Sequence, residues 1–131
     1  MTKIVHVAVG VIKFENKFFL TKRLMDSHQG GLWEFPGGKV EKNETVHQAL
    51  HRELKEEVSI DTLSCTSLMQ ISHDYGDKKV LLDVFVVDNF TGEPLPLEGQ
   101  ESGWFTLAEF DALNFPAANQ AIIEKLQKTY Q

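Results

Sequence analysis

The sequence predicts an α/β fold of the α+β type, a mixed and mainly antiparallel β-sheet with about three helices. Three observations predict it. Several segments rich in Val and Ile alternate apolar and polar residues, as strands do. Short polar turns separate pairs of these segments, as in hairpins. Residues 45–58 and 117–129 instead space their apolar residues three and four apart, which indicates helices. At 131 residues, with 42% hydrophobic, we expect a single domain spanning 1–131.

The first part of the chain is predicted to form strands. Residues 4–14 have the pattern of a half-buried strand, and after a Glu-Asn-Lys turn residues 18–23 form the second arm of a hairpin. A loop over 24–31 follows. Residues 32–35 then form a short apolar strand, which the Pro-Gly-Gly turn of 36–38 closes.

Residues 45–58 are predicted to form an amphipathic helix. Thr45 and Gln48 have the spacing of a capping box, so Thr45 is the expected N-cap. The helix should end at Ser59. One buried stripe is expected to consist of Val46, Ala49, Leu50, Leu54 and Val58.

The second half of the chain alternates strands and short helices. Residues 62–75 and 79–90 are strand-like and are joined by a Gly-Asp-Lys turn, which predicts a second hairpin. After a loop with two prolines, 104–105 form a short strand and 106–113 a short helix. Residues 117–129 form the C-terminal helix. Its packing residues are expected to be Ile122, Ile123 and Leu126.

The charge balance limits the partners of the chain. It carries 13 Lys and Arg against 19 Asp and Glu, a formal net charge of −6, which argues against a nucleic-acid polymer or an anionic membrane as partner. A phosphate compound fits only if a metal cation lies between it and the protein. The single Cys65 excludes a disulfide and indicates the reducing cytoplasm. The apolar run near the N-terminus is too short to span a membrane.

Three carboxylates crowd one side of the predicted helix. At 100° per residue, Glu53, Glu56 and Glu57 fall within an arc of about 100°. Like charges at such spacings repel one another. A solvated acidic face is the ordinary interpretation, but Val46 and Leu50 fall on the same side, where the helix should meet the rest of the fold. A hard divalent cation such as Mg²⁺ is therefore expected to bind there.

The same region resembles a known family. Gly38, five residues, Glu44, seven residues, the run from Arg52 to Glu57, and Ile60 after a small residue are similar to the 23-residue motif of the Nudix hydrolases. One position differs, because Ser59 stands where the family usually has glycine, and we expect a small structural cost there with activity intact. The resemblance implies the Nudix fold, with the sheet sandwiched between α-helices.

Further segments resemble the MutT-like members of that family. These are residues 21–23, 34–41, 98–100 and 115–119, in the same order along nearly the whole chain. The resemblance implies a Mg²⁺-dependent pyrophosphohydrolase, with Mn²⁺ as a possible substitute. It implies hydrolysis of 8-oxo-dGTP to the monophosphate and pyrophosphate, which cleanses the precursor pool for DNA replication and prevents mutation. The expected partner is therefore a small nucleotide, and the expected state is a cytoplasmic monomer.

The resemblance also implies the roles of the acidic residues. Metal ions are expected among Gly37 (through its carbonyl), Glu53, Glu56, Glu57 and Glu98. Glu53 is the expected general base, which takes a proton from the attacking water. Arg52 should pair with neighbouring carboxylates and orient them, and Glu44 should be more structural than catalytic.

Substrate contacts are expected from several short segments. Asn119 offers a donor and an acceptor, so it could read the edge of a purine, although an Asn before a helix is also a common N-cap. Phe35 lies either near the base or in the core. The expected substrate-binding residues are Arg23, His28, Glu34, Phe35, Pro36, Gly37, Gly38 and Asn119.

Two patterns carry no assigned function. His47 and His51 have the spacing of a zinc helix, but residue 48 is Gln rather than Glu, and both should be solvated. Trp33 and Trp104 are expected to be core or rim residues rather than a stacking platform. Two alternatives to the leading function stay open: a Nudix enzyme for another nucleotide, such as a CTP or dCTP pyrophosphohydrolase, and a nucleotide-binding sensor without turnover.

Overall fold

The described part of the computed structural model, residues 3–25 and 30–130, contains one mixed sheet. Its central order is β3-β2-β1-β6-β5, and β4 and β7 pair with β1 and β2. The β1–β6 pair is parallel and the other pairs are antiparallel, as predicted for the sheet. The strands are β1 (Lys3–Phe14), β2 (Lys17–Lys22), β3 (Trp33–Glu34), β4 (Gly37–Lys39), β5 (Asp61–Asp74), β6 (Lys78–Thr91) and β7 (Ser102–Phe105).

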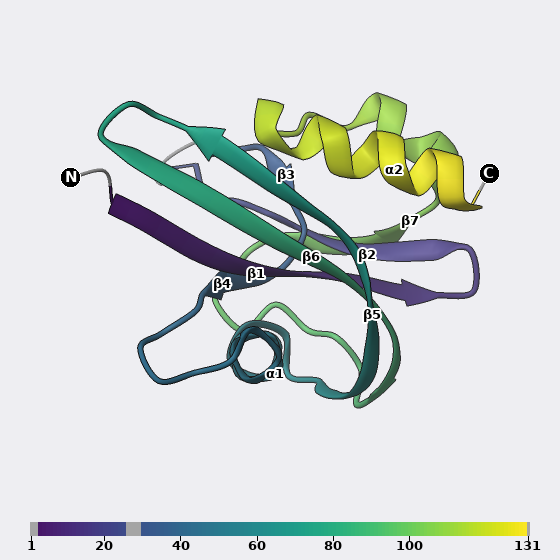
Figure 1. The fold of residues 1–131 in the computed structure, drawn as a ribbon. Helices are drawn as coiled ribbons and strands as arrows, with labels where there is room; N and C mark the ends of the chain where they lie inside the picture. The colour runs from purple at the N-terminus through teal and green to yellow at the C-terminus, as the bar shows by residue number, and fades with distance from the viewer. Residues whose placement is uncertain (1–2, 26–29, 131) are drawn as a thin grey trace.

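Helices cover both faces of the sheet (Figure 1). α1 (Val46–Val58) lies on one face and α2 (Gln120–Tyr130) on the other. In α1 the predicted capping box is present, since the Thr45 hydroxyl accepts from the Gln48 N–H and the Gln48 side chain accepts from the Thr45 N–H. The predicted apolar stripe is confirmed by the burial of Ala49, Leu50, Leu54 and Val58, and the α2 contacts by that of Ile122, Ile123 and Leu126.

The centre of β1 is buried on both sides, where the sequence predicted a half-buried strand. Ala8 and Ile12 pack with α1, while Val9 and Val11 pack with α2. The pattern arises because successive side chains of a strand point to opposite faces, and here each face meets a helix. An alternating sequence alone does not reveal the second layer.

Two short helical segments are tighter than an α-helix. The predicted helix over 106–113 is the 3-10 helix η1 (Leu107–Ala112). The first turn of the predicted C-terminal helix is a separate 3-10 turn, η2 (Ala117–Asn119), which follows Pro116. Short segments of this kind commonly adopt 3-10 geometry next to α-helices.

Residues 37–39 form a strand where the sequence predicted only a turn. Gly37, Gly38 and Lys39 pair antiparallel with Val9, Ala8 and Val7 of β1. A Cβ at Gly37 would overlap the carbonyl oxygen of Ala8, so the pairing requires glycine. β4 thereby brings Gly37 and Gly38 close to α1.

The end of α1 is held by the loop that follows β6. The N–H groups of Leu95 and Leu97 donate to the carbonyls of Val58 (3.0 Å) and Glu57 (2.9 Å). These bonds satisfy carbonyls that a helix end leaves without partners. Ser59 caps the helix at φ 63°, in the left-handed region. Within the described residues, no helix is long and apolar enough to cross a membrane.

Candidate active site

Two neighbouring cavities contain most of the predicted site residues. The first, of about 280 Å³, we call the apolar cavity, and its apolar walls are Val7, Val9, Phe35, Val80, Leu82, Pro116 and Ala118. Its polar side chains are those of Arg23, Glu34, Lys39, His73, Tyr75 and Asn119. The second, of about 250 Å³, we call the acidic cavity, and it is lined by Arg23, Glu34, Gly37, Glu57, Glu98 and Gln100, with Leu24 at its edge. Arg23, Glu34 and Gly37 line both, so the cavities meet there.

Glu57 is the most perturbed carboxyl group of the acidic cavity. Its Oε2 accepts a hydrogen bond of 2.9 Å from the N–H of Gly37. Burial raises the pKa of Glu57 to about 8, and the charges of Glu53, Glu34 and Glu98 act in the same direction, against the hydrogen bond. A buried carboxyl group held this way favours a proton or a cation on its oxygens.

Glu34 and Arg23 form an ion pair at the junction of the cavities. Arg23 Nη1 lies 3.2 Å from Glu34 Oε1. Burial nevertheless raises the pKa of Glu34, because desolvation outweighs the attraction of Arg23, and the charge of Glu98 adds to it. The junction therefore presents a guanidinium group beside carboxylates, at a place where a ligand can enter from either cavity.

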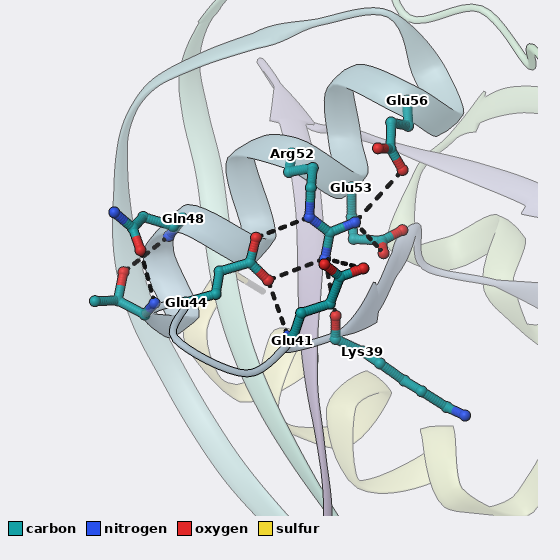
Figure 2. A network of polar contacts seen from close by, with 8 residues as sticks. Lys39, Glu41, Glu44, Gln48, Arg52, Glu53 and Glu56 are labelled. Carbon is teal, nitrogen blue, oxygen red and sulfur yellow. Dashed lines mark hydrogen bonds and ion pairs between the residues drawn. The ribbon is translucent and has the colours of Figure 1, made fainter.

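Arg52 connects α1 to the segment after β4 (Figure 2). Its Nε and Nη2 donate to the two carboxylate oxygens of Glu44 at 2.8 and 3.0 Å. Its Nη1 donates to Glu53 Oε1 at 2.9 Å, and Nη2 also reaches the carbonyl of Lys39 at 3.0 Å. The planar guanidinium group makes these contacts at once, which fixes the position of Glu53 relative to β4.

Glu44 is held by this network. The Arg52 hydrogen bond, followed by the bond from the Glu41 N–H, lowers the pKa of Glu44 to about 2. The carboxylate thus stays ionised when the neighbouring acids are protonated. These contacts connect Glu44 to the loop before α1, as expected of a structural residue.

The three carboxylates of the predicted arc divide into inner and outer groups. Glu53 and Glu57 are half-buried, with the Glu53 side chain 17% exposed, whereas that of Glu56 is 61% exposed and lies 3.4 Å from Arg52 Nη1. A Cβ added at Gly38 would overlap the Glu53 carboxylate, so Glu53 lies directly over β4. Among the described residues, neither Glu53 nor Glu56 lines the acidic cavity itself.

The donor set fits a hard cation, although the side chains do not yet form a closed cage. Within the described residues, no group of three or more His, Cys, Asp or Glu is close enough to hold a metal ion as it stands. Glu57 and Glu98 nevertheless line one cavity, and Glu53 lies nearby, over Gly38. Carboxylate oxygens of this kind, together with backbone oxygens, suit Mg²⁺ or Mn²⁺.

Six of the eight predicted substrate-binding residues line the apolar cavity, namely Arg23, Glu34, Phe35, Gly37, Gly38 and Asn119, and Pro36 does not. Half-buried Asn119 lies at the end of η2 and lines the cavity, and its N–H donates to the Pro116 carbonyl at 2.9 Å. Phe35 belongs to both the cavity wall and the core. It lines the cavity, and its ring stacks on that of Phe115 with 6.0 Å between the centroids. The Pro36 carbonyl accepts from the Gly10 N–H at 2.8 Å. His28 lies outside the described residues.

The sequence did not predict part of the apolar cavity. Val7, Leu82 and His73 come from three neighbouring strands and reach the cavity through the sheet register, and Tyr75 stands at the tip of the β5–β6 hairpin. The alternation of these strands was visible in the sequence. The sequence did not show the register that aligns these strands.

The remaining patterns are surface or packing features, as expected. His47 and His51 are exposed on α1. Trp33 packs on Phe105 with ring centroids 5.0 Å apart, and Trp104 packs on Phe19 at 5.4 Å.

Comparisons with known proteins match this chain along nearly its whole length. A family described as NUDIX domain matches residues 7–125. An 8-oxo-dGTP diphosphatase of Escherichia coli strain K12 is 39% identical over 127 residues, 96% of this chain and 98% of that protein. A CTP pyrophosphohydrolase of the same strain is 34% identical over 116 residues, 88% of this chain and 84% of that protein. A structure described as MutT from Aliivibrio salmonicida and Vibrio cholerae has a TM-score of 0.87 at 34% identity, over 98% of this chain and 100% of that chain.

Proposed function

Because the chain belongs to the NUDIX domain family of hydrolases, we propose that it is a MutT-like 8-oxo-dGTP diphosphatase. Its reaction on the phosphoric anhydride would give 8-oxo-dGMP and pyrophosphate, and would remove an oxidised precursor before DNA replication. The observation that carries the proposal is the meeting of the acidic cavity with the apolar cavity at Arg23 and Glu34. A nucleoside triphosphate has the same two parts, a phosphate chain and a base.

The acidic cavity is where we place the phosphate chain. Glu57, Glu98 and Gly37 line it, and Glu53 lies beside it over Gly38. These residues and exposed Glu56 would hold Mg²⁺, for which Mn²⁺ could substitute. When bound, the cation neutralises phosphate charge and lowers the pKa of water. Arg23 would bind a phosphate oxygen in exchange for part of its contact with Glu34.

Glu53 is the proposed general base. It would accept the proton of the attacking water, and its orientation depends on the 2.9 Å bond from Arg52 Nη1. Arg52 is itself held by both oxygens of Glu44, so the base is connected to a rigid support. This chain of contacts positions the base before substrate arrives, which is what efficient proton transfer requires.

The apolar cavity is where we place the base. Phe35 and Pro116 supply apolar contact, and Asn119 supplies a donor and an acceptor for the edge of the purine. Pro36 and Gly38 would shape the floor between base and phosphates. The nucleotide is the only partner that the proposal needs, and we propose a cytoplasmic monomer, which size-exclusion chromatography of the purified protein tests.

A substrate screen tests the function. Purified protein is incubated with Mg²⁺ and 8-oxo-dGTP, dGTP, CTP or dCTP, and the products are separated by chromatography. We expect 8-oxo-dGMP and pyrophosphate, with 8-oxo-dGTP hydrolysed in preference to the other nucleotides. Equal rates on 8-oxo-dGTP, dGTP and dCTP would refute the assignment.

A CTP pyrophosphohydrolase is the second candidate, because a relative of that description is 34% identical over most of the chain. Preference for CTP or dCTP in the same screen would favour it. A nucleotide sensor would bind in the screen without forming any product.

A further inference from the structure

We propose that His73, a residue outside the family motif, is a specificity-determining residue that hydrogen-bonds the nucleobase at the outer end of the apolar cavity. The inference rests on the proposed function and adds to it a second base-reading side chain beside Asn119. It starts from the composition of the cavity. The wall combines apolar and polar residues, and two of the polar ones, Asn119 and His73, come from different elements, η2 and β5.

The sheet register places His73 far from the phosphate end. Val9 of β1 pairs with both Gly37 of β4 and Val84 of β6, so these three residues stand at one level of the sheet. His73 pairs with Val80, four residues back along β6. At ~3.3 Å per residue this is roughly 13 Å along the strands, and β5 lies three strand spacings from β4, roughly 14 Å. In a nucleotide, the part farthest from the phosphates is the base.

The hairpin tip holds His73 in place. Its ring lies against Tyr75 with centroids 4.4 Å apart, and Lys78 Nζ stands 6.0 Å from the centroid of the Tyr75 ring. The Tyr75 N–H donates to the Lys78 carbonyl at 2.8 Å, and the Gly76 N–H donates to Asp74 Oδ1 at 2.8 Å. The turn is therefore closed by its own hydrogen bonds, and the two exposed rings stand side by side at the edge of the cavity.

The chemistry of the base requires more than Asn119. Guanine presents the acceptors O6 and N7 along one edge. Oxidation at C8 turns N7 into a donor and adds the acceptor O8, so that edge then carries three polar groups. One amide offers a single carbonyl and a single amino group, and a polar atom buried against an apolar wall without a partner is costly. An imidazole N–H adds one donor, which complements the acceptor O8.

Discrimination follows from this pairing. A site that hydrogen-bonds a substrate group rejects an analogue lacking that group more strongly than an apolar pocket can. With dGTP, O8 is missing, so the N–H donor of the imidazole loses its partner on the base. We therefore expect His73 to contribute to the preference for the oxidised base rather than to the rate of hydrolysis of all nucleotides alike.

Three variants test this inference. H73F keeps a ring against Tyr75 but removes the hydrogen-bonding groups, and H73Q keeps a donor and an acceptor without the ring. H47F is the matched control, because His47 is an exposed histidine on α1, on the other face of the sheet. For each protein we would measure kcat/KM for 8-oxo-dGTP and dGTP, and the affinity for 8-oxo-dGMP by calorimetry.

We expect H73F to lower the ratio of the two kcat/KM values about three- to tenfold and to weaken 8-oxo-dGMP binding by a similar factor. H73Q should keep most of the preference, and H47F should equal the wild type. An unchanged ratio in H73F, or equal losses in H73F and H73Q, would overturn the inference. A wild-type protein with no preference for 8-oxo-dGTP would instead overturn the proposed function, so the two failures are distinguishable.

Discussion

The half-buried carboxyl group of Glu57 makes the stability of the metal-free protein depend on pH. Below pH 4.5 this group is protonated in both folded and unfolded chains. Between pH 4.5 and about 8 the unfolded chain loses the proton while the folded protein keeps it, so stability falls as pH rises. Above about 8 both states are ionised and the loss is complete.

The size of the effect follows from the displaced pKa. A rise from 4.5 to about 8 corresponds to at most about 5 kcal/mol at ~1.4 kcal/mol per pH unit. Domains are typically stable by only ~5–15 kcal/mol, so a loss of this order would be a measurable part of the stability of the metal-free protein. A bound divalent cation should remove the dependence, because it replaces the proton on the carboxylate.

The assay is urea unfolding in EDTA from pH 5 to pH 9, followed by circular dichroism. E57Q is the matched variant, because its amide oxygen can still accept from the Gly37 N–H and carries no charge. We expect the wild type to lose stability with rising pH and E57Q to lose much less, with Glu34 present in both. Curves for the two proteins that run parallel over this range would refute the reasoning, and saturating Mg²⁺ should flatten the wild-type curve.

Three other predictions concern α1 and its ends. E53Q should lower kcat by ~10²–10⁴-fold because it removes the proposed base, while nucleotide binding remains measurable by calorimetry; full activity would exclude that role. S59G should raise stability by about 0.5–1 kcal/mol in urea unfolding with kcat unchanged, since Ser59 adopts φ 63°. The pKa of Glu44 is lowered to about 2, so this carboxylate stabilises the folded protein above pH 4.5, and the stabilisation disappears as pH falls towards 2. The E44Q variant should lack this loss of stability in acid. An acid-unfolding midpoint identical in E44Q and wild type would contradict this.

The sequence predicts those parts of the fold that depend on neighbouring residues. The capping box at Thr45, the stripe through Leu54 and both hairpins follow from spacing within about 30 residues, and the structure confirms them. The 3-10 geometry of η1 and η2 was not predictable, because a segment of three to six residues has the same apolar spacing in either kind of helix.

Contacts between distant segments explain the other differences. β4 forms because Gly37 fits against Ala8, and nothing in a Pro-Gly-Gly sequence distinguishes that approach from a turn. The positions of Arg52, Glu53 and Glu57 followed from the helix, but the 17% exposure of Glu53 and the burial of Glu57 depend on β4 and on the loop after β6. His73 joins the cavity only through the register of β5 on β6, which a single sequence does not specify.

The parallel pairing of β1 with β6 has a consequence for folding during synthesis on the ribosome. Lys3 pairs with Lys78 and Ile12 with Val87, so β1 leaves the ribosome long before its central partner is made. At ~5–20 residues per second the delay is roughly 4 to 15 s. During that time Val9, Val11 and Ile12 belong to an open strand edge, which is the kind of surface that aggregates or recruits chaperones. We therefore expect the nascent chain to be most prone to aggregation just before β6 leaves the ribosome.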